Sequence, residues 1–262
     1  MKLSVITVCL NSRATIAEAI ASVHRQTHPD IEHIIIDGKS TDGTLDAIAP
    51  YRSRIAGLVS ESDEGLYFAM NKGIALATGD YIGFLNADDI YVDDRVLSRV
   101  AGALDQGRVD SAYGDLVYVD AVDTSRVLRY WKSRPYRNGL VEAGWVPAHP
   151  TFFVRAAILK DIGGFDTRYR YQSDFEIMIR LFIDRRISSA YVPEVLVRMR
   201  TGGHTNRSLR NIIRGNLEAY SAARRHGIAR SPFWILSKLY YRAVTFFLRP
   251  KSGHRNSTGG YR

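Results

Sequence analysis

Cysteine and long apolar runs are the scarcest features of this 262-residue sequence. Its only cysteine is Cys9, which excludes a disulfide framework within the chain and favours a reducing, cytoplasmic compartment. Cys9 lies inside the apolar run Leu3–Leu10, so we expect it to be a buried structural thiol. Asn11 interrupts that run after about eight residues, and we therefore expect no signal peptide.

Acidic residues are scarce in the last quarter of the chain. The whole sequence carries a net charge of +9, yet residues 198–262 hold 14 Lys and Arg residues against one acid, Glu218. The chain is thus a mildly acidic body with a strongly basic end. Such an end is typical of a contact with membrane headgroups, a lipid diphosphate or nucleic acid, or of a solvated surface that aids solubility.

Strand and helix patterns alternate through the first half of the sequence. Continuous apolar strands in such an order predict an α/β fold, with a mostly parallel sheet covered by helices on both faces. The carboxyl ends of parallel strands meet at one edge, so Asn11, Asp37, Asp63 and Asp88 should gather there. We expect strands at Leu3–Val8, Glu32–Asp37, Gly57–Ser60 and Tyr81–Leu85, and helices at Ala14–His24, Ser40–Tyr51 (capped by Ser40 or Thr41), Leu66–Ala77 and Asp94–Leu104.

The second half is less regular and predicts a mixed or antiparallel region, with a loop over residues 136–150. We divide the chain into a main domain, 1–206, a basic and aromatic helical extension, 207–251, and a polar tail, 252–262, expected to be disordered. The expected elements are strands at Ser111–Val119, Leu128–Trp131 and Ala190–Arg198, and helices at Asp174–Ile183, Leu209–His226 and Phe233–Leu248.

The helix expected at Phe233–Leu248 is rich in aromatic residues but too short for an ordinary membrane span. Lys238, Arg242, Thr245 and Arg249 would fall on one stripe, with apolar residues around the rest of the helix. That pattern suits a helix lying in an anionic membrane surface. It equally suits a helix that packs on the domain, or on a second subunit of an oligomer.

Two buried strands end in carboxylates, which are costly to desolvate unless a cation or a substrate meets them. One is followed by Asn86-Ala87-Asp88-Asp89, and the other by the string from Asp37 to Thr44. With the segment from Asp63 to Gly73, which matches the pattern D-x-G-x-x-x-A-x-N-x-G, they resemble family 2 glycosyltransferases of the GT-A fold, a Rossmann-like mixed sheet flanked by helices. The resemblance covers residues 3 to about 206 and implies transfer of a sugar from a nucleotide-diphosphate donor.

The resemblance assigns the first two strand ends to the nucleoside. Thr7 and Val8 would lie against the base through backbone groups, with Asn11 nearby, and Asp37 would accept a hydrogen bond from the base. Asp42 is better explained as a helix cap than as a ligand.

The next two motifs are assigned to the donor's nucleoside and diphosphate. Asp63 would contact the nucleoside, and Lys72 would either face the phosphates or be a solvated lysine. Asn86, Ala87 and Asp88 occupy the D-x-D position, in which Asp88 would hold Mn²⁺ or Mg²⁺ against the diphosphate. Asn86 replaces the first acid, so it can donate an oxygen but no charge, and we expect Asp89 to be structural.

The remaining candidates lie in the second half of the chain. Inverting transfer needs a carboxylate as general base near the acceptor hydroxyl, and the resemblance points to Asp174. Glu176 is the second choice, with a salt bridge or helix-dipole role as its alternative. His149 would border the donor sugar or the acceptor, or be structural, and His204 would reach the metal or the diphosphate. We expect Asp166 to be structural.

The leading hypothesis is an inverting glycosyltransferase of bacterial surface polysaccharide assembly. It would use a UDP-sugar, or one of GDP or dTDP, and a lipid-linked saccharide as acceptor, as a peripheral protein on the cytoplasmic face of the inner membrane. Transfer to polyprenyl phosphate is the alternative. A nucleotidyltransferase would need a phosphate-binding loop after the first strand, which Asn11-Ser12-Arg13 does not supply. A nucleic-acid partner is not expected, because the basic end lacks a helix-turn-helix or RNP signature.

Overall fold

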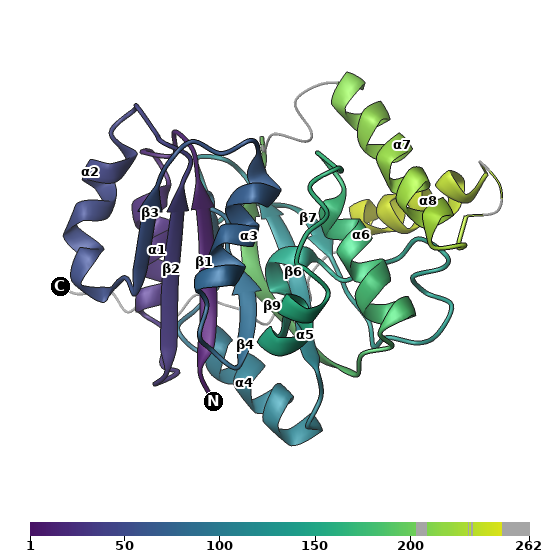
Figure 1. The fold of residues 1–262 in the computed structure, drawn as a ribbon, viewed down its shortest axis with the longest axis horizontal. Helices are drawn as coiled ribbons and strands as arrows, with labels where there is room; N and C mark the ends of the chain where they lie inside the picture. The colour runs from purple at the N-terminus through teal and green to yellow at the C-terminus, as the bar shows by residue number, and fades with distance from the viewer. Residues whose placement is uncertain (203–208, 230, 232, 248–262) are drawn as a thin grey trace.

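The computed structural model describes residues 1–202, 209–229, 231 and 233–247 (Figure 1). His204, Arg249 and the 252–262 tail lie outside the described residues, so the predictions made for them stay untested. The strands form one mixed sheet in the order β3-β2-β1-β4-β8-β6-β9-β5, and β7 pairs with β6. Its strands are β1 (Leu3–Cys9), β2 (Ile31–Asp37), β3 (Gly57–Ser60), β4 (Tyr81–Phe84), β5 (Asp89–Tyr91), β6 (Ser111–Val119), β7 (Val127–Trp131), β8 (Phe153–Arg155) and β9 (Ser189–Arg200).

Helices cover both faces of this sheet, as the apolar strands predicted. The four strands β1 to β4 are parallel, whereas β8 runs antiparallel to both β4 and β6. The helices are α1 (Ile16–His24), α2 (Thr44–Ile48), the 3-10 turn η1 (Ala49–Arg54), α3 (Leu66–Leu76), α4 (Val96–Gly107), η2 (His149–Thr151), α5 (Ala156–Asp161), α6 (Ser173–Ile179), the π-helical turn η3 (Arg180–Asp184), α7 (Leu209–Arg225) and α8 (Trp234–Phe247).

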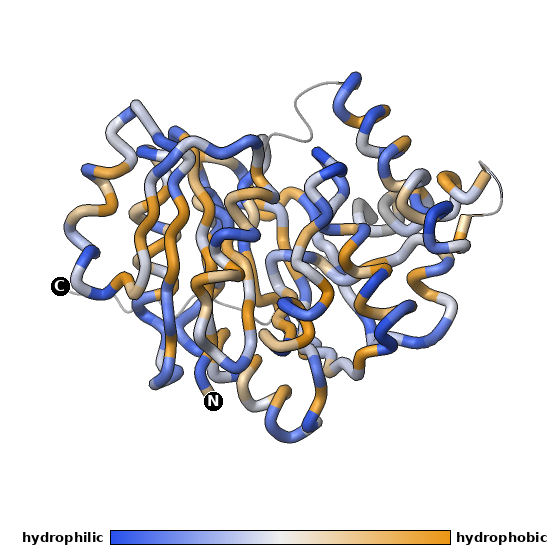
Figure 2. Tube along the Cα trace, viewed as in Figure 1, coloured by the Kyte–Doolittle hydropathy of each residue, from blue (hydrophilic) through white to orange (hydrophobic). Residues whose placement is uncertain are grey.

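Alternation along the central strands explains the two-sided core. Ile34 and Ile36 of β2 face the cluster that includes α3, while Ile35 faces the cluster that includes α1. Hydrophobic segments accordingly follow the central strands in Figure 2. Cys9 is buried in the α1 cluster, as expected, and burial raises the pKa of its thiol, which keeps it protonated.

Several local predictions were wrong. The strands β5 and β8 and the helix α5 were not predicted, and the helix expected at Asp174–Ile183 changes to a π-helical turn at Arg180. Neither Ser40 nor Thr41 caps α2. Its N-cap is Gly43, at φ 90°, and Asp42 accepts a hydrogen bond from the Thr44 N–H instead. Asp42 is therefore structural, as predicted, although the N-cap position that was predicted for it belongs to Gly43.

The two C-terminal helices lie against the main domain (Figure 1). Ala219, Ala222 and Ala223 of α7 are fully buried in the same cluster as α3 and α6. Helix α8 packs on β7, with Thr245 turned inward to accept a hydrogen bond from Arg129. Lys238 and Thr245 of the predicted polar stripe thus contact the main domain. This is the arrangement expected for a helix that packs on the domain, one of the alternatives that the sequence left open. Among the residues that the structure describes, none of the helices combines the length and apolar character needed to cross a bilayer.

Candidate active site

The carboxyl ends of β1, β2, β3 and β4 meet at one edge of the sheet, as predicted from the sequence. Asp37, at the end of β2, is 0% exposed there. It accepts hydrogen bonds from the Ser40 N–H and hydroxyl and from the Ser60 hydroxyl, and these hold its pKa below the usual value despite burial. The Cys9 thiol also donates to Asp37, so a base that bound this carboxylate would have to displace one of these partners.

Asn11 joins the first two strand ends. Its backbone N–H donates to the Ser40 hydroxyl at 2.8 Å, and its side-chain oxygen accepts from the Thr41 N–H at 2.9 Å. A φ of 51° puts Asn11 in the left-handed region, which asparagine tolerates better than most residues. Asn11 therefore fixes the relative position of the two loops that border the predicted nucleoside site.

Thr7 and Val8, the two residues predicted to contact the base, direct their peptide groups toward different neighbours of β1. The Gly38 N–H donates to the Cys9 oxygen, and the Leu85 N–H donates to the Ile6 oxygen, so the peptide groups of alternate β1 residues point toward β2 and toward β4. Thr7 faces β2, and its hydroxyl lies 3.0 Å from His33 Nε2 in the core.

Val8 faces the side of β4, whose pairing with β1 ends at Ile6 and Phe84. The peptide groups of Val8 lie beyond the last hydrogen-bonded pair of β1 and β4. The backbone of Thr7, in contrast, pairs with β2, and its side chain contacts His33. The geometry leaves Val8, rather than Thr7, in a position to contact a base.

Asp63 and Lys72 contact each other. Lys72 Nζ lies 2.6 Å from Asp63 Oδ1 and 2.6 Å from Glu61 Oε1, and these two carboxylates raise the pKa of Lys72. In this structure two carboxylates neutralise the charge of Lys72, and the prediction that it faces phosphates stays a prediction. The side chain of Asp63 is 6% exposed, and its second oxygen is buried without a hydrogen-bond partner among the described residues.

Two other members of the same motif have structural roles. The side-chain amide of Asn71 donates to the Phe165 oxygen and accepts from the Phe165 N–H. A Cβ on Gly73 would lie 2.4 Å from Ile6 Cγ2, so glycine is needed where α3 crosses β1. The asparagine and the last glycine of the D-x-G-x-x-x-A-x-N-x-G pattern are therefore explained by the packing of α3.

The segment after β4 brings Asn86, Asp88 and Asp89 together. Asn86 donates from its side chain to Asp89 at 2.9 Å, and Asp89 is fully buried, with one carboxylate oxygen unpartnered among the described residues. Burial raises the pKa of Asp88, and burial together with Asp88 raises that of Asp89. Arg200, at the end of β9, donates to the Asp88 backbone oxygen and pairs with Glu18.

These oxygen donors fit a hard divalent ion that takes its other ligands from a diphosphate and water. The described residues contain no group of three or more acidic, histidine or cysteine side chains that could hold a metal alone. Asp88 and Asn86 would therefore hold a metal only together with the donor.

A cavity of about 280 Å³ opens beside the sheet edge, and Asn86, Tyr67, His149 and Asp174 line it. Asp174 lies in the first turn of α6 and accepts a hydrogen bond from the Tyr67 hydroxyl at 3.3 Å. His149 stacks on the Phe84 ring with 5.2 Å between centroids, and burial lowers the pKa of its imidazole against the opposing effect of Asp174. The cavity thus holds one carboxylate beside a neutral imidazole.

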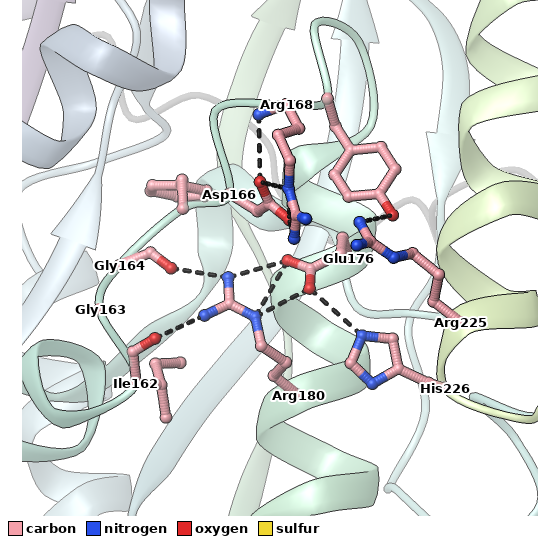
Figure 3. Close-up of a pocket in the computed structure, with 11 residues that line it drawn as sticks. Ile162, Gly163, Gly164, Asp166, Arg168, Glu176, Arg180, Arg225 and His226 are labelled. Carbon is pink, nitrogen blue, oxygen red and sulfur yellow. Dashed lines mark hydrogen bonds and ion pairs between the residues drawn. The ribbon is translucent and has the colours of Figure 1, made fainter.

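Glu176 lies on another side of α6 and does not line that cavity. It is 3% exposed, pairs with Arg180 at 2.8 Å, and lies 3.3 Å from His226 Nε2 (Figure 3). The remaining Arg180 donors reach the carbonyl oxygens of Ile162 and Gly164. The salt-bridge alternative for Glu176 is therefore the one that the structure supports.

Figure 3 shows a second, larger cavity of about 440 Å³, and the two carboxylates that line it, Asp166 and Glu176, are already paired. Asp166 pairs with Arg168, in keeping with its expected structural role, and Arg225 Nη1 lies 3.5 Å from the Tyr169 hydroxyl. The pairing of Glu176 with Arg180 and His226 joins α6 to the end of α7, and it leaves no unpaired carboxylate among the described residues that line this cavity.

Sequence reasoning missed two residues of the site. Tyr67 lies inside the Asp63–Gly73 motif, but its role becomes visible only in its contact with Asp174, which is 107 positions away in the sequence. Arg200 ends β9, and its position against Asp88 depends on the β5–β9 pairing. Neither contact has a local sequence signal.

Comparison with known proteins identifies a single family. The sequence model of Glycosyl transferase family 2 matches residues 4–163. A PGL/p-HBAD biosynthesis glycosyltransferase of Mycobacterium bovis is 32% identical over 196 residues, which is 74% of each chain. EpsE of Bacillus subtilis is 28% identical over 250 residues, 92% of this chain and 89% of EpsE.

Solved structures share the fold at low sequence identity. Residues 1–349 of Staphylococcus aureus TarS, in complex with UDP-GlcNAc, superpose with a TM-score of 0.68 at 17% identity, over 93% of this chain and 73% of that one. This chain spans 41% of the longer TarS chain. The mannosyltransferase PcManGT of Pyrobaculum calidifontis, in complex with GDP-Man and Mn²⁺, gives a TM-score of 0.63 at 20% identity, over 93% and 69%.

Proposed function

The chain belongs to glycosyltransferase family 2 and has the GT-A fold, and we propose that it transfers a sugar from a UDP-sugar to a hydroxyl group of a lipid-linked saccharide, with inversion. That it is a nucleotide-sugar glycosyltransferase follows from the family. The observation that carries the finer proposal is the position of Asp174 as the only carboxylate among the described residues lining the cavity beside the sheet edge.

Inverting transfer is a single displacement, and Asp174 supplies its base. The acceptor oxygen forms a bond to the anomeric carbon while the bond from that carbon to the diphosphate oxygen breaks on the opposite side. The acceptor proton passes to Asp174. Tyr67 donates to one oxygen of Asp174, which orients the carboxylate and leaves the other oxygen for the proton. His149 is neutral, so one ring nitrogen can donate a hydrogen bond to a sugar hydroxyl while the other can accept one.

We assign the leaving diphosphate to the segment after β4. Asp88 and Asn86 would hold Mn²⁺ or Mg²⁺, which neutralises charge on the departing group. Burial already disfavours the charged form of Asp88, so a cation there would offset that penalty. A neighbouring fold was solved with GDP-Man and Mn²⁺, which supports a metal-dependent reaction here.

We assign the nucleoside to the strand ends. Val8 would contact the base through its peptide groups, with Asn11 fixing the loop beside it. Asp37 would hold the turn, and would meet the base only after its serine contacts open. The unpartnered oxygen of Asp63 would accept a hydrogen bond from a ribose hydroxyl, while the ion pair with Lys72 holds that carboxylate in position. UDP is favoured because the neighbouring TarS was solved with UDP-GlcNAc.

A hydroxyl acceptor is favoured over polyprenyl phosphate by the same carboxylate. A phosphate oxygen is already ionised at neutral pH, so it needs no base. A sugar hydroxyl needs a proton acceptor, which Asp174 provides.

The exposed side of the C-terminal helices supports a peripheral site at the membrane. Ile213 and Leu217 on α7 and Phe233, Leu236 and Tyr240 near or on α8 are all more than half exposed, in a strongly basic part of the sequence. Apolar side chains beside Lys and Arg suit an anionic bilayer surface. We propose that these residues hold the enzyme at the cytoplasmic face of the inner membrane, where a lipid-linked acceptor would be presented during surface polysaccharide synthesis.

A thermal-shift panel tests the donor part of the proposal. UDP, GDP, dTDP and CMP are each added with Mn²⁺, Mg²⁺ or EDTA to wild type, Asp88→Ala and Asp174→Asn. Ligand at 100 times its Kd adds about 2.7 kcal/mol of apparent stability. We expect a metal-dependent shift with UDP in wild type and Asp174→Asn, and none in Asp88→Ala. A shift that EDTA leaves intact would contradict the metal assignment, and no shift with any nucleotide would contradict the donor assignment.

A further inference from the structure

The cavity that holds Asp174 has a second wall, which is built by β7 and α8 and has not been assigned a role. In the β6–β7 pair, Leu116 lies opposite Trp131 and Tyr118 lies opposite Arg129. Side chains two apart on a strand point to the same face, so these four side chains form one block, and all four line the cavity. The β6–β7 hairpin thus presents two aromatic rings and a guanidinium to the ligand space.

Helix α8 completes this wall. Lys238, Tyr241 and Thr245 lie at positions i, i+3 and i+7, which places them on one face of the helix, and all three line the cavity. Arg129 Nε donates to the Thr245 hydroxyl at 2.7 Å, and Lys238 Nζ donates to Gln172 Oε1 at 2.6 Å. Gln172 is the N-cap of α6, two residues before Asp174, so α8 is fastened directly to the element that carries the base.

The charge of the cavity is strongly one-sided. Among the described residues that line it, one is acidic, Asp174, and four are cationic: Arg129, Lys132, Arg134 and Lys238. Arg129 is 7% exposed and lies over the Tyr118 ring at 4.8 Å. Lys132 and Arg134 are exposed and follow β7 directly, where Arg134 lies 5.7 Å from the centre of the Tyr241 ring. A cavity of this composition selects a ligand that is anionic and also offers apolar surface.

The donor's diphosphate is a poor match for this wall. In the proposed function that diphosphate lies at Asp88, and Asp88 is not among the described residues that line the cavity. Asn86 and Asp174 both line the cavity, and the wall is joined to the helix that carries Asp174 through the hydrogen bond from Lys238 to Gln172. The anion that the wall favours would therefore lie next to the base, where the acceptor binds.

We infer that the β7–α8 wall is an anion subsite for the acceptor, and that it binds a phosphate group attached close to the hydroxyl that receives the sugar. The inference rests on the proposed transferase function, because it takes Asp174 as the base. The cavity, at about 280 Å³, lies near the lower end of the range for small-ligand sites, so base and phosphate must be bridged by a short saccharide. A lipid diphosphate that carries a single sugar has this chemistry, with the aromatic rings covering the apolar surface of the sugar and the first part of the lipid.

The test compares two probes on the full-length protein. One is N-acetylglucosamine linked through a diphosphate to an undecyl chain, and the other is the undecyl glycoside of the same sugar without phosphate. Binding of each is measured by calorimetry with UDP and Mn²⁺ present. We expect the diphosphate probe to bind about tenfold more tightly, the effect of one charge-assisted contact. Inorganic pyrophosphate, measured in the same way, reports what the anion contributes without sugar or lipid, and should bind more weakly than the diphosphate probe.

Charge variants locate the effect. The double variant Lys132→Gln/Arg134→Gln should bind the two probes with nearly equal affinity. The control Arg25→Gln/Arg137→Gln removes the same charge from exposed positions outside the cavity and should keep the tenfold preference. In both variants the UDP-dependent thermal shift should match wild type.

Several results would overturn the inference. Equal binding of the two probes by wild type would do so, as would a preference that survives in Lys132→Gln/Arg134→Gln or is lost equally in the control. Failure of both probes to bind, with the UDP shift intact, would also reject the acceptor subsite while leaving the donor site standing. Loss of the UDP shift in wild type would instead count against the proposed function.

Discussion

The two carboxylates in the first turn of α6 should give opposite phenotypes when each is replaced by its amide. Asp174→Asn keeps the size of the side chain and an oxygen that can still accept from Tyr67, so the fold should be retained. It removes the proton acceptor. Loss of a general base typically lowers the rate of the chemical step by about 10²–10⁴-fold, or roughly 3–5 kcal/mol in activation free energy. Donor binding should not change.

Glu176→Gln should instead lower stability. Its carboxylate is almost fully buried between Arg180 and His226, and removing one partner of a buried ion pair costs about 3–5 kcal/mol. Arg180 keeps two carbonyl acceptors, so we expect the lower end, about 3 kcal/mol, or roughly 6–12 °C in melting temperature for a chain of this size. Below its melting temperature this variant should transfer sugar at close to the wild-type rate.

The assay is single-turnover transfer at 20 °C, with UDP binding and thermal melting measured on the same preparations. Using one turnover isolates the chemical step from product release. If Glu176→Gln abolished transfer while folded and Asp174→Asn kept it, the base would be Glu176 and the cavity beside the sheet edge would have been misassigned.

Two further predictions concern the C-terminal helices. His226 lies 3.3 Å from Glu176 and 2.9 Å from Asp184, and these partners raise its pKa above the ordinary 6.5. Its stabilising effect should be complete below about pH 6.5 and lost as pH rises through the folded-state pKa. The melting-temperature difference between wild type and His226→Gln should therefore shrink as pH rises, and a difference that grows with pH would contradict this prediction. Vesicles containing phosphatidylglycerol should co-sediment the wild type but less of Phe233→Ser/Leu236→Ser. The control Val122→Ser changes an even more exposed apolar residue outside these helices and should bind like wild type. Equal binding by all three proteins would exclude these helices as the membrane contact.

The part of the fold that could be predicted is the part with strong local patterns. The strands Gly57–Ser60 and Ser111–Val119 were predicted with the bounds that the structure shows, because each has a core of apolar or aromatic residues typical of strands. The strand β8 was missed because it has only three residues and exists through its neighbours. Phe153 packs where Gly83 of β4 leaves no side chain, and a Cβ there would lie 2.4 Å from the Phe153 ring.

The candidate site divides in the same way. The gathering of strand ends could be predicted, since parallel strands bring Asp37 and Asp88 to one edge whatever the details of packing. The pairing of Lys72 with Asp63 could not, because a lysine nine residues from an aspartate can face it or face a ligand, and only the path of the chain between β3 and α3 decides. The different positions of Thr7 and Val8 depend on a fact that their own sequence does not contain, namely that β4 ends three residues before β1 does.

The choice between Asp174 and Glu176 shows why the sequence left two candidates for the base. The two carboxylates are two residues apart, so on a helix they point in different directions, and each direction is defined by segments remote in sequence. Asp174 faces Tyr67, 107 residues earlier, and the cavity wall that α8 completes more than sixty residues later. Glu176 faces Arg180 and His226, the second of which follows α7. The C-terminal helices therefore do two things for one short helix: α7 fixes its buried side through an ion pair, and α8 encloses its reactive side. Removing them should alter catalysis as well as membrane binding, which is the reverse of what a detachable basic tail would predict.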